Sequence, residues 1–144
     1  MSIHFFTEKV TFSLKHKNKL KKWINQVCLN EKMVIGNLNI VFTSNERILE
    51  INSQFLNHYY FTDIITFNSN TERLIGGDIF ISIDTVNENS VIYGSTLIDE
   101  LYRVIIHGVL HLLGYDDKTE KQKKMMRIME NVALKSLYEN FLHG

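Results

Sequence analysis

Two histidines and one aspartate in a short segment have the spacing of a metal site. His107 and His111 are four residues apart, and on a helix residues at that spacing project from the same face, one turn apart. Gly114 follows three residues later, where a left-handed conformation can end the helix and reverse the chain. That reversal would bring Asp117 to the two imidazoles. Two nitrogens and one carboxylate oxygen leave a fourth metal position open, which is typical of catalytic rather than structural zinc.

The helix expected over residues 98–113 decides how this pattern is interpreted, because a histidine pair at helical spacing is more often incidental. Most positions of the segment are apolar, and a helix that is apolar almost all round is buried. Arg103, His107 and His111 repeat every four residues and form one narrow polar stripe. A polar stripe on a buried helix must find partners or line a cleft. The pattern therefore favours a metal site over a satisfied core histidine pair.

The spacing also invites a comparison with zinc peptidases. Metzincins carry His-Glu-x-x-His-x-x-Gly-x-x-His, in which the glutamate accepts a proton from water. The ligand and glycine spacing is the same here, but Gly108 occupies the glutamate position. Peptide hydrolysis is therefore disfavoured, and a metallopeptidase ranks third among the functions considered.

Residues 107–116, His-Gly-Val-Leu-His-Leu-Leu-Gly-Tyr-Asp, resemble the signature of the YbeY-type metal-dependent endoribonucleases. Residues 62–67 (Thr-Asp-Ile-Ile-Thr-Phe) are similar to that family's Thr-Asp-Val-Leu-Ser-Phe strand, and residues 77–79 to its Gly-Asp-Ile strand. Ile51-Asn52 stands where the family has Leu-Asn. The order and spacing fit over roughly residues 40–118.

The resemblance implies a single-strand-specific endoribonuclease that acts in ribosomal RNA maturation and ribosome quality control. Its expected cofactor is zinc (Zn2+), one ion per chain, held by His107, His111 and Asp117. Such an ion can lower the pKa of a bound water to about 7 and polarise a phosphoryl oxygen. Single-stranded or precursor ribosomal RNA is the expected substrate, and the small ribosomal subunit with its proteins an expected partner. The alternative function is a ribosome-associated binding protein whose metal site is structural or vestigial.

The chain departs from the family pattern at two places. The third ligand of the family is usually histidine, and here it is Asp117. An ungapped count places Leu56 where the family has an arginine implicated in activity, and His58 where lysine is frequent. Loss of that arginine favours the binding-protein alternative, whereas the open three-ligand site opposes it.

Two further residues are catalytic candidates. Arg103 lies on the metal-bearing stripe and could contact phosphate in place of the missing arginine, or it could pair with Asp99, four residues earlier on the same helix. The motif contains no glutamate that could accept a proton from a metal-bound water. Asp116, the phosphate leaving group or a second water could each contribute, and the sequence leaves these alternatives open.

Composition predicts a single globular domain over residues 1–144. A chain of 144 residues buries roughly two-thirds of its unfolded surface. The one cysteine, Cys28, excludes an internal disulfide and is expected in the core. No stretch reaches the ~18 apolar residues of a membrane span, so a cytoplasmic protein without membrane contact is expected.

The balanced charge, 16 basic against 16 acidic residues, gives no overall attraction to nucleic acid, so any basic surface must be local. Two runs qualify: Lys15, Lys17, Lys19, Lys21 and Lys22, and then Lys118, Lys121, Lys123, Lys124 and Arg127. The first run is more simply interpreted as a solvated helix surface. The second run begins directly after Asp117, and it could be either a solvated surface or a surface that binds RNA.

Hydrophobic periodicity predicts strands mixed with helices, an α+β or α/β fold. Strands are expected over residues 3–6, 9–12, 38–43, 64–67 and 78–83, with a turn at Gly76-Gly77. Helices are expected around residues 20–28, 46–55, 84–89, 98–113 and 120–141. Thr43-x-x-Glu46 and Thr119-x-x-Gln122 are capping-box patterns that begin two of these helices. The apolar residues of the last helix are Met125, Met129, Val132, Leu137 and Phe141, and the two methionines are expected to pack in the core. The resemblance implies a mixed four-stranded sheet with about five helices packed on it.

Overall fold

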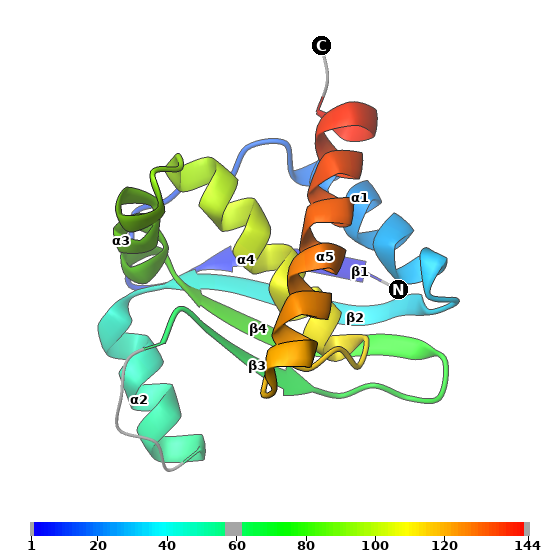
Figure 1. Cartoon of the computed structure of the whole chain (residues 1–144). Coiled ribbons are helices and arrows are strands. Elements are labelled where there is room, and N and C mark those ends of the chain that lie inside the picture. Colours follow the sequence, from blue (N-terminus) through cyan, green and yellow to red (C-terminus); the bar gives the residue numbers. More distant parts are fainter. Residues whose placement is uncertain (1, 57–61, 143–144) are drawn as a thin grey trace.

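The computed structural model describes residues 2–56 and 62–142 of the chain (Figure 1). The strands are β1 (Ser2–Thr7), β2 (Val34–Thr43), β3 (Ile64–Asn68) and β4 (Leu74–Ser82). The helices are α1 (Lys17–Asn30), α2 (Asn45–Phe55), α3 (Ile83–Tyr93), α4 (Leu97–Leu112) and α5 (Glu120–Ser136), and a short π-helical segment (Leu137–Phe141) continues α5. The predicted mixture of a four-stranded sheet and five helices is confirmed within the described residues.

The sheet is mixed, with the strand order β1-β2-β4-β3. β1 and β2 pair in parallel, β2 and β4 pair in parallel, and β3 pairs antiparallel to β4. Alternate residues of β2, Leu38, Ile40 and Phe42, are fully buried, because successive side chains of a strand point to opposite faces. This buried face belongs to the main core.

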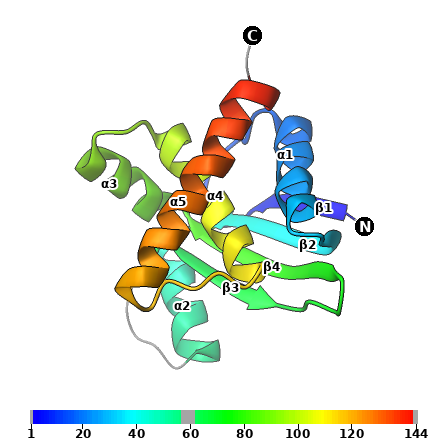
Figure 2. The same ribbon diagram turned by 45° about the vertical axis from the view of Figure 1, so that its right-hand side comes forward.

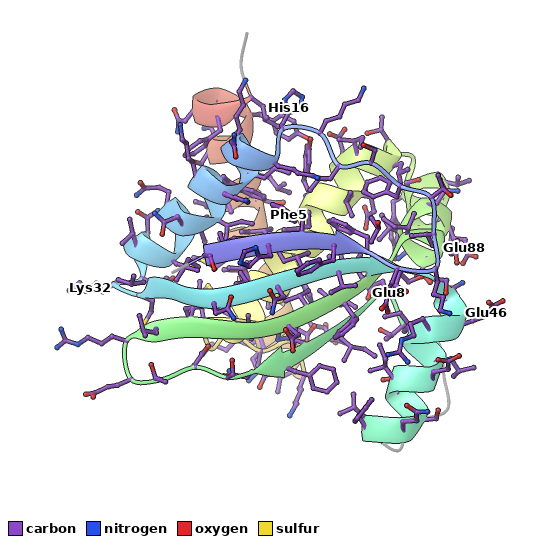
Figure 3. The ribbon with its side chains drawn as sticks, turned by 180° about the vertical axis from the view of Figure 1, so that it is seen from behind. Phe5, Glu8, His16, Lys32, Glu46 and Glu88 are labelled. Carbon is purple, nitrogen blue, oxygen red and sulfur yellow. The ribbon has the colours of Figure 1, made fainter. Side chains whose placement is uncertain are left out.

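Helices α1, α4 and α5 lie on one face of the sheet (Figures 1 and 2). Figure 3 shows the opposite face, which these three helices leave uncovered. There α2 forms a smaller cluster in which Ile48 and Ile51 are buried together with Ile65 of β3. The site described below is built entirely on the other, helix-covered side.

Helix α4 is the most buried helix of the molecule. From Leu101 to Leu112 every residue is buried except the half-buried Arg103, His107 and His111. The predicted polar stripe on an otherwise apolar helix is thereby confirmed. The remaining faces of α4 contact the sheet and the neighbouring helices. Between Leu101 and Leu112, solvent therefore reaches the helix only along this polar stripe.

Several local expectations were wrong in position. Gly76 and Gly77 lie inside β4 rather than in a turn. Gly77 has φ +141°, and a Cβ there would lie 2.1 Å from the carbonyl oxygen of Phe67, so this glycine serves close strand pairing. Residues 9–12 form no strand. The N-cap of α2 is Ser44, one residue after the expected Thr43, and its side chain accepts a hydrogen bond from the Arg47 amide.

The buried face of α5 is also displaced by one residue. Met126 is 2% exposed, whereas Met125 and Val132 are 48% and 60% exposed. Met129 is half-buried and packs against the core, as expected. The capping box of Thr119 and Gln122 is confirmed by both of its hydrogen bonds. Apolar residues stand side by side in α5, as at Met125-Met126 and Ile128-Met129. Such pairs do not mark which side of the helix faces the core, so the neighbouring α4 decides it.

The thiol of Cys28 should be chemically inert in the folded protein. It is fully buried, and this burial, followed by the charge of Glu31, raises the pKa of the thiol to about 12. Because the thiolate is the reactive form, we expect no measurable reaction with a thiol-specific chromogenic reagent at pH 8. The same reagent should react fully in guanidinium chloride. Rapid reaction of the native protein would contradict this burial.

Candidate metal centre

The end of α4 sets the direction in which the chain approaches the histidine stripe. The amide of Gly114 donates to the carbonyl of His111 at 3.0 Å, and the amide of Tyr115 donates to the carbonyl of Leu110 at 3.0 Å. Gly114 has φ +105°, and a Cβ there would meet nothing within 4 Å. The glycine is therefore needed for its backbone conformation rather than for space. The predicted chain reversal at this residue is confirmed.

The segment after the turn is fixed at both of its ends. The hydroxyl of Tyr115 donates to the carboxylate of Glu31, the residue that directly follows α1. The amides of Lys118 and Thr119 both donate to the side-chain oxygen of Gln122, each at 3.0 Å. These contacts hold Asp117 between two anchored points, so its side chain returns over the last turn of α4.

His107, His111 and Asp117 converge on one point. The Nε2 atoms of the two histidines are 3.0 Å apart, and Oδ2 of Asp117 lies 3.3 Å from each of them. Ligand atoms bound tetrahedrally to zinc at its usual bond lengths lie roughly 3.4 Å from one another. The three atoms therefore form a triangle of nearly the right size, and this group could hold a metal ion.

A buried glutamate that the sequence analysis missed lies behind this triangle. Glu130 of α5 is 5% exposed, and its Oε2 is 2.6 Å from Nδ1 of His107. Burial alone would raise the pKa of Glu130, but hydrogen bonds from His107 and Arg103 outweigh burial and lower it. The residue is therefore an ionised carboxylate that accepts a hydrogen bond from Nδ1–H of His107. The signal in the sequence was a charged residue on the α5 face that carries Met126 and Ala133.

The same interaction acts on the histidine. Burial alone would lower the pKa of His107, but the hydrogen bond and the negative charge of Glu130, with smaller contributions from Asp117 and Asp63, raise it above its ordinary value. Both pKa shifts have the same main cause, the contact between the His107 ring and the Glu130 carboxylate. With Nδ1–H donating a hydrogen bond to Glu130, the ring directs Nε2 toward His111 and Asp117.

Arg103 is engaged on the same carboxylate. Its Nη1 lies 2.8 Å from Oε1 of Glu130, and its Nη2 donates to the side-chain oxygen of Asn131 at 2.9 Å. The alternative in which Arg103 pairs with Asp99 does not hold in the described structure, where Asp99 instead accepts a hydrogen bond from the hydroxyl of Tyr138. Sequence spacing could not anticipate Glu130, because the partner comes from another helix.

The remaining sequence candidates lie apart from the triangle. Asp116 is exposed, and its Oδ1 accepts a hydrogen bond of 3.3 Å from the amide of Asp117. Leu56 directly follows α2 and is 39% exposed, and His58 lies outside the described residues. Arg127 of α5 is the exposed cation beside the site, with Nη1 at 3.8 Å from Oε1 of Glu130.

Gly108, which stands where metzincins have their catalytic glutamate, points away from the site. A Cβ at this position would lie 2.7 Å from Cδ1 of Ile64 and 3.1 Å from Cγ2 of Ile79. The glycine therefore allows α4 to approach β3 and β4 closely. A glutamate there would be driven into an apolar contact, which gives a physical reason against the peptidase alternative.

Comparison with known proteins places the chain in a family. The family model described as endoribonuclease YbeY matches residues 2–138. An endoribonuclease YbeY from Cytophaga hutchinsonii is 48% identical over 134 residues, which cover 92% of this chain and 94% of the relative. One from Porphyromonas gingivalis is 42% identical over 137 residues, covering 95% and 91%. The chain therefore belongs to the YbeY family of RNA-cleaving hydrolases.

A solved structure supports the fold independently. The solution structure of a Thermotoga maritima protein superimposes with a TM-score of 0.66 at 28% sequence identity, covering 94% of this chain and 89% of that protein.

None of the helices in the described ranges is both long and apolar enough to cross a membrane.

Replacing the two neighbouring aspartates should separate a ligand from a bystander. Asp117→Ala removes one corner of the triangle, and we expect zinc affinity to fall by more than the ~10–100-fold that is typical for loss of an outer-sphere partner. Asp116→Ala should change it far less, because Asp116 contacts only the neighbouring amide. Asp117→His should retain the metal and favour zinc over manganese. Competition with a chromogenic chelator measures all three, and the reverse order of the two alanine variants would show that the wrong aspartate is assigned.

Proposed function

We propose that this chain is a metal-dependent, single-strand-specific endoribonuclease that cleaves ribosomal RNA or its precursor during ribosomal RNA maturation and ribosome quality control. The observation that carries the proposal is the convergence of His107, His111 and Asp117 in a member of the YbeY family. The expected cofactor is one zinc ion per chain, with these three residues as its ligands. The proposed site of action is the cytoplasm, on or near the small ribosomal subunit.

The exposure of the triangle suits a large substrate. The two histidine side chains are 23% exposed, and that of Asp117 is 39% exposed, so a phosphodiester can approach from the solvent side. A divalent ion at this point would polarise a phosphoryl oxygen and make a water molecule more acidic. The chain itself contributes by holding two imidazole nitrogens and one carboxylate oxygen in a fixed arrangement. The oxygen ligand suits harder ions, so manganese or magnesium should compete better than at a site of three histidines.

The cation that faces the RNA phosphate must come from residues other than Leu56. A phosphate contact by Arg103 stays a prediction, since its guanidinium already bonds Glu130 and Asn131. Arg127 has a side chain that is 63% exposed and lies beside the same glutamate. It belongs to the exposed basic run of α5 that begins directly after Asp117. We assign this run to contacts with the RNA backbone. Proton transfer by Asp116 likewise stays a prediction.

The alternative of a ribosome-associated binding protein keeps one observation in its favour. Leu56 is an exposed aliphatic residue at the position where the family carries an arginine, so one cation expected near the phosphate is missing. The two functions differ in a direct assay of RNA cleavage, and casein digestion by the same preparation tests the remaining peptidase alternative.

Cleavage should depend on the metal and on the triangle together. We expect purified protein to cut single-stranded ribosomal RNA, a chelator to abolish cutting, and added zinc to restore it. His111→Ala should remain folded, because the buried apolar side of α4 is unchanged, and should lose metal and activity together. Gel analysis of end-labelled RNA and metal analysis of the same samples provide the measurements. Tight RNA binding without cleavage by the zinc-loaded protein would favour the binding-protein alternative.

The basic run of α5 should contribute electrostatic binding of RNA. For the double variant Lys123→Gln and Arg127→Gln, we expect weaker binding to single strands of any sequence. The salt dependence, the slope of log K against log salt concentration, should decrease by about 0.7 per lost phosphate contact. The control is Lys19→Gln with Lys22→Gln on α1, which removes the same charge from exposed positions. Equal losses in both double variants would show that only net charge matters.

A further inference from the structure

We propose that Glu130 is a positioning residue that fixes His107 as a metal ligand, and that Arg103 in turn holds Glu130 in place. This inference rests on the proposed metal site and assigns to two further residues a role in building it. It also gives Arg103 a function other than direct contact with phosphate.

The position of Glu130 is unusual for a charged residue. It is buried on a face of α5 whose other buried members, Met126, Ala133 and Leu134, belong to the apolar core. A buried carboxylate destabilises a protein unless its charge is paired and its oxygens accept hydrogen bonds. Here the two oxygens are divided, Oε2 to His107 at 2.6 Å and Oε1 to Arg103 at 2.8 Å. An apolar side chain could fill this position without the free-energy cost of burying a charge. The presence of a carboxylate is therefore explained by its contacts with His107 and Arg103.

The division of the two oxygens has a consequence for the imidazole. A carboxylate can only accept, so Nδ1 of His107 must carry the proton in this contact. In the neutral imidazole that binds a metal, Nε2 then keeps its lone pair, and it is the Nε2 atom that lies 3.0 Å from Nε2 of His111 and 3.3 Å from Asp117. The glutamate thus selects the tautomer and the ring orientation that metal binding requires. Without it, the ring can rotate or present a protonated Nε2 to the metal.

Arg103 fixes the glutamate by joining α4 to α5. Its two terminal nitrogens bind the side chains of consecutive residues, Glu130 and Asn131. Arg103 and His107 are one turn apart on α4, so they contact the two oxygens of the same carboxylate from the same helix. Both oxygens of the carboxylate are therefore bonded, and it has little freedom to turn. The packing of α4 against α5 thus fixes the orientation of the His107 ring.

Two variants of Glu130 separate this role from simpler ones. Glu130→Gln keeps the size and reach of the side chain but places an amide NH₂ against one of two hydrogen-bond donors. Glu130→Asp keeps the charge but is shorter by one methylene and cannot span the present contact with His107. A role in packing alone predicts that the glutamine variant retains metal affinity. A role through charge alone predicts that the aspartate variant retains it.

We expect both variants to lose zinc affinity by about 10–100-fold, the range measured when outer-sphere partners of metal-binding histidines are removed. Affinity is measured by chelator competition on the full chain, with the thermal melt of the metal-free protein recorded beside it. The cobalt-substituted protein provides a second readout, because its visible spectrum reports the ligand geometry. Glu139→Gln is the matched control, since Glu139 is an exposed carboxylate whose ion pair with Lys135 lies far from the triangle in sequence. Wild-type affinity and spectrum in either folded variant would overturn the proposal.

A measurement on the wild-type protein removes any dependence on how the variants fold. Long-range proton–nitrogen NMR of the zinc-loaded protein distinguishes a protonated ring nitrogen from a metal-bound one. The proposal requires protonated Nδ1 and metal-bound Nε2 at His107, and the opposite assignment would overturn it. If the wild-type protein binds no zinc, the proposed function fails as well. If it binds zinc and the Glu130 variants match it, only the role of Glu130 fails.

Discussion

The burial of α4 is the constraint on which the rest of the structure depends. From Leu101 to Leu112 the sheet and the neighbouring helices cover nearly all of its surface, so this stretch can keep polar side chains only along one strip. Arg103, His107 and His111 occupy that strip. Gly108, on another side, lets the helix lie close to Ile64 and Ile79. The same packing that stabilises the domain therefore fixes the position and direction of the candidate metal ligands.

Helix α5 completes the site because it supplies what α4 cannot. Arg103 and His107 both need a partner, and Glu130 satisfies both with one carboxylate. Loss of any one member of such a buried network destabilises the fold, since a buried charge is then left without a partner. The arrangement is consistent with a site in which rigidity of the ligands matters more than the stability that an apolar residue would provide.

Two departures from the usual family pattern change the charge of the site in the same direction. Asp117 brings a negative charge to the triangle, and Leu56 is uncharged at the position where the ungapped count places the family arginine. Under the proposed function, an RNA phosphate would therefore depend more strongly on a bound cation and on exposed basic side chains. The basic run of α5 begins directly after Asp117, and Arg127 lies against the acidic network. Both observations connect the metal site with its proposed substrate in one region of the surface.

The sequence by itself determined the local features of this protein, and the tertiary structure decided the partners. His107, His111, Gly114 and Asp117 could be recognised because helical periodicity and a glycine turn act over short distances. The mixed sheet followed from strand patterns and from the resemblance to a family. Glu130 could not be recognised, because its role depends on which face of α5 meets α4, and the apolar residues of α5 suggested a face displaced by one residue. The alternative that paired Arg103 with Asp99 was also wrong, since a contact between two helices leaves no spacing in the sequence.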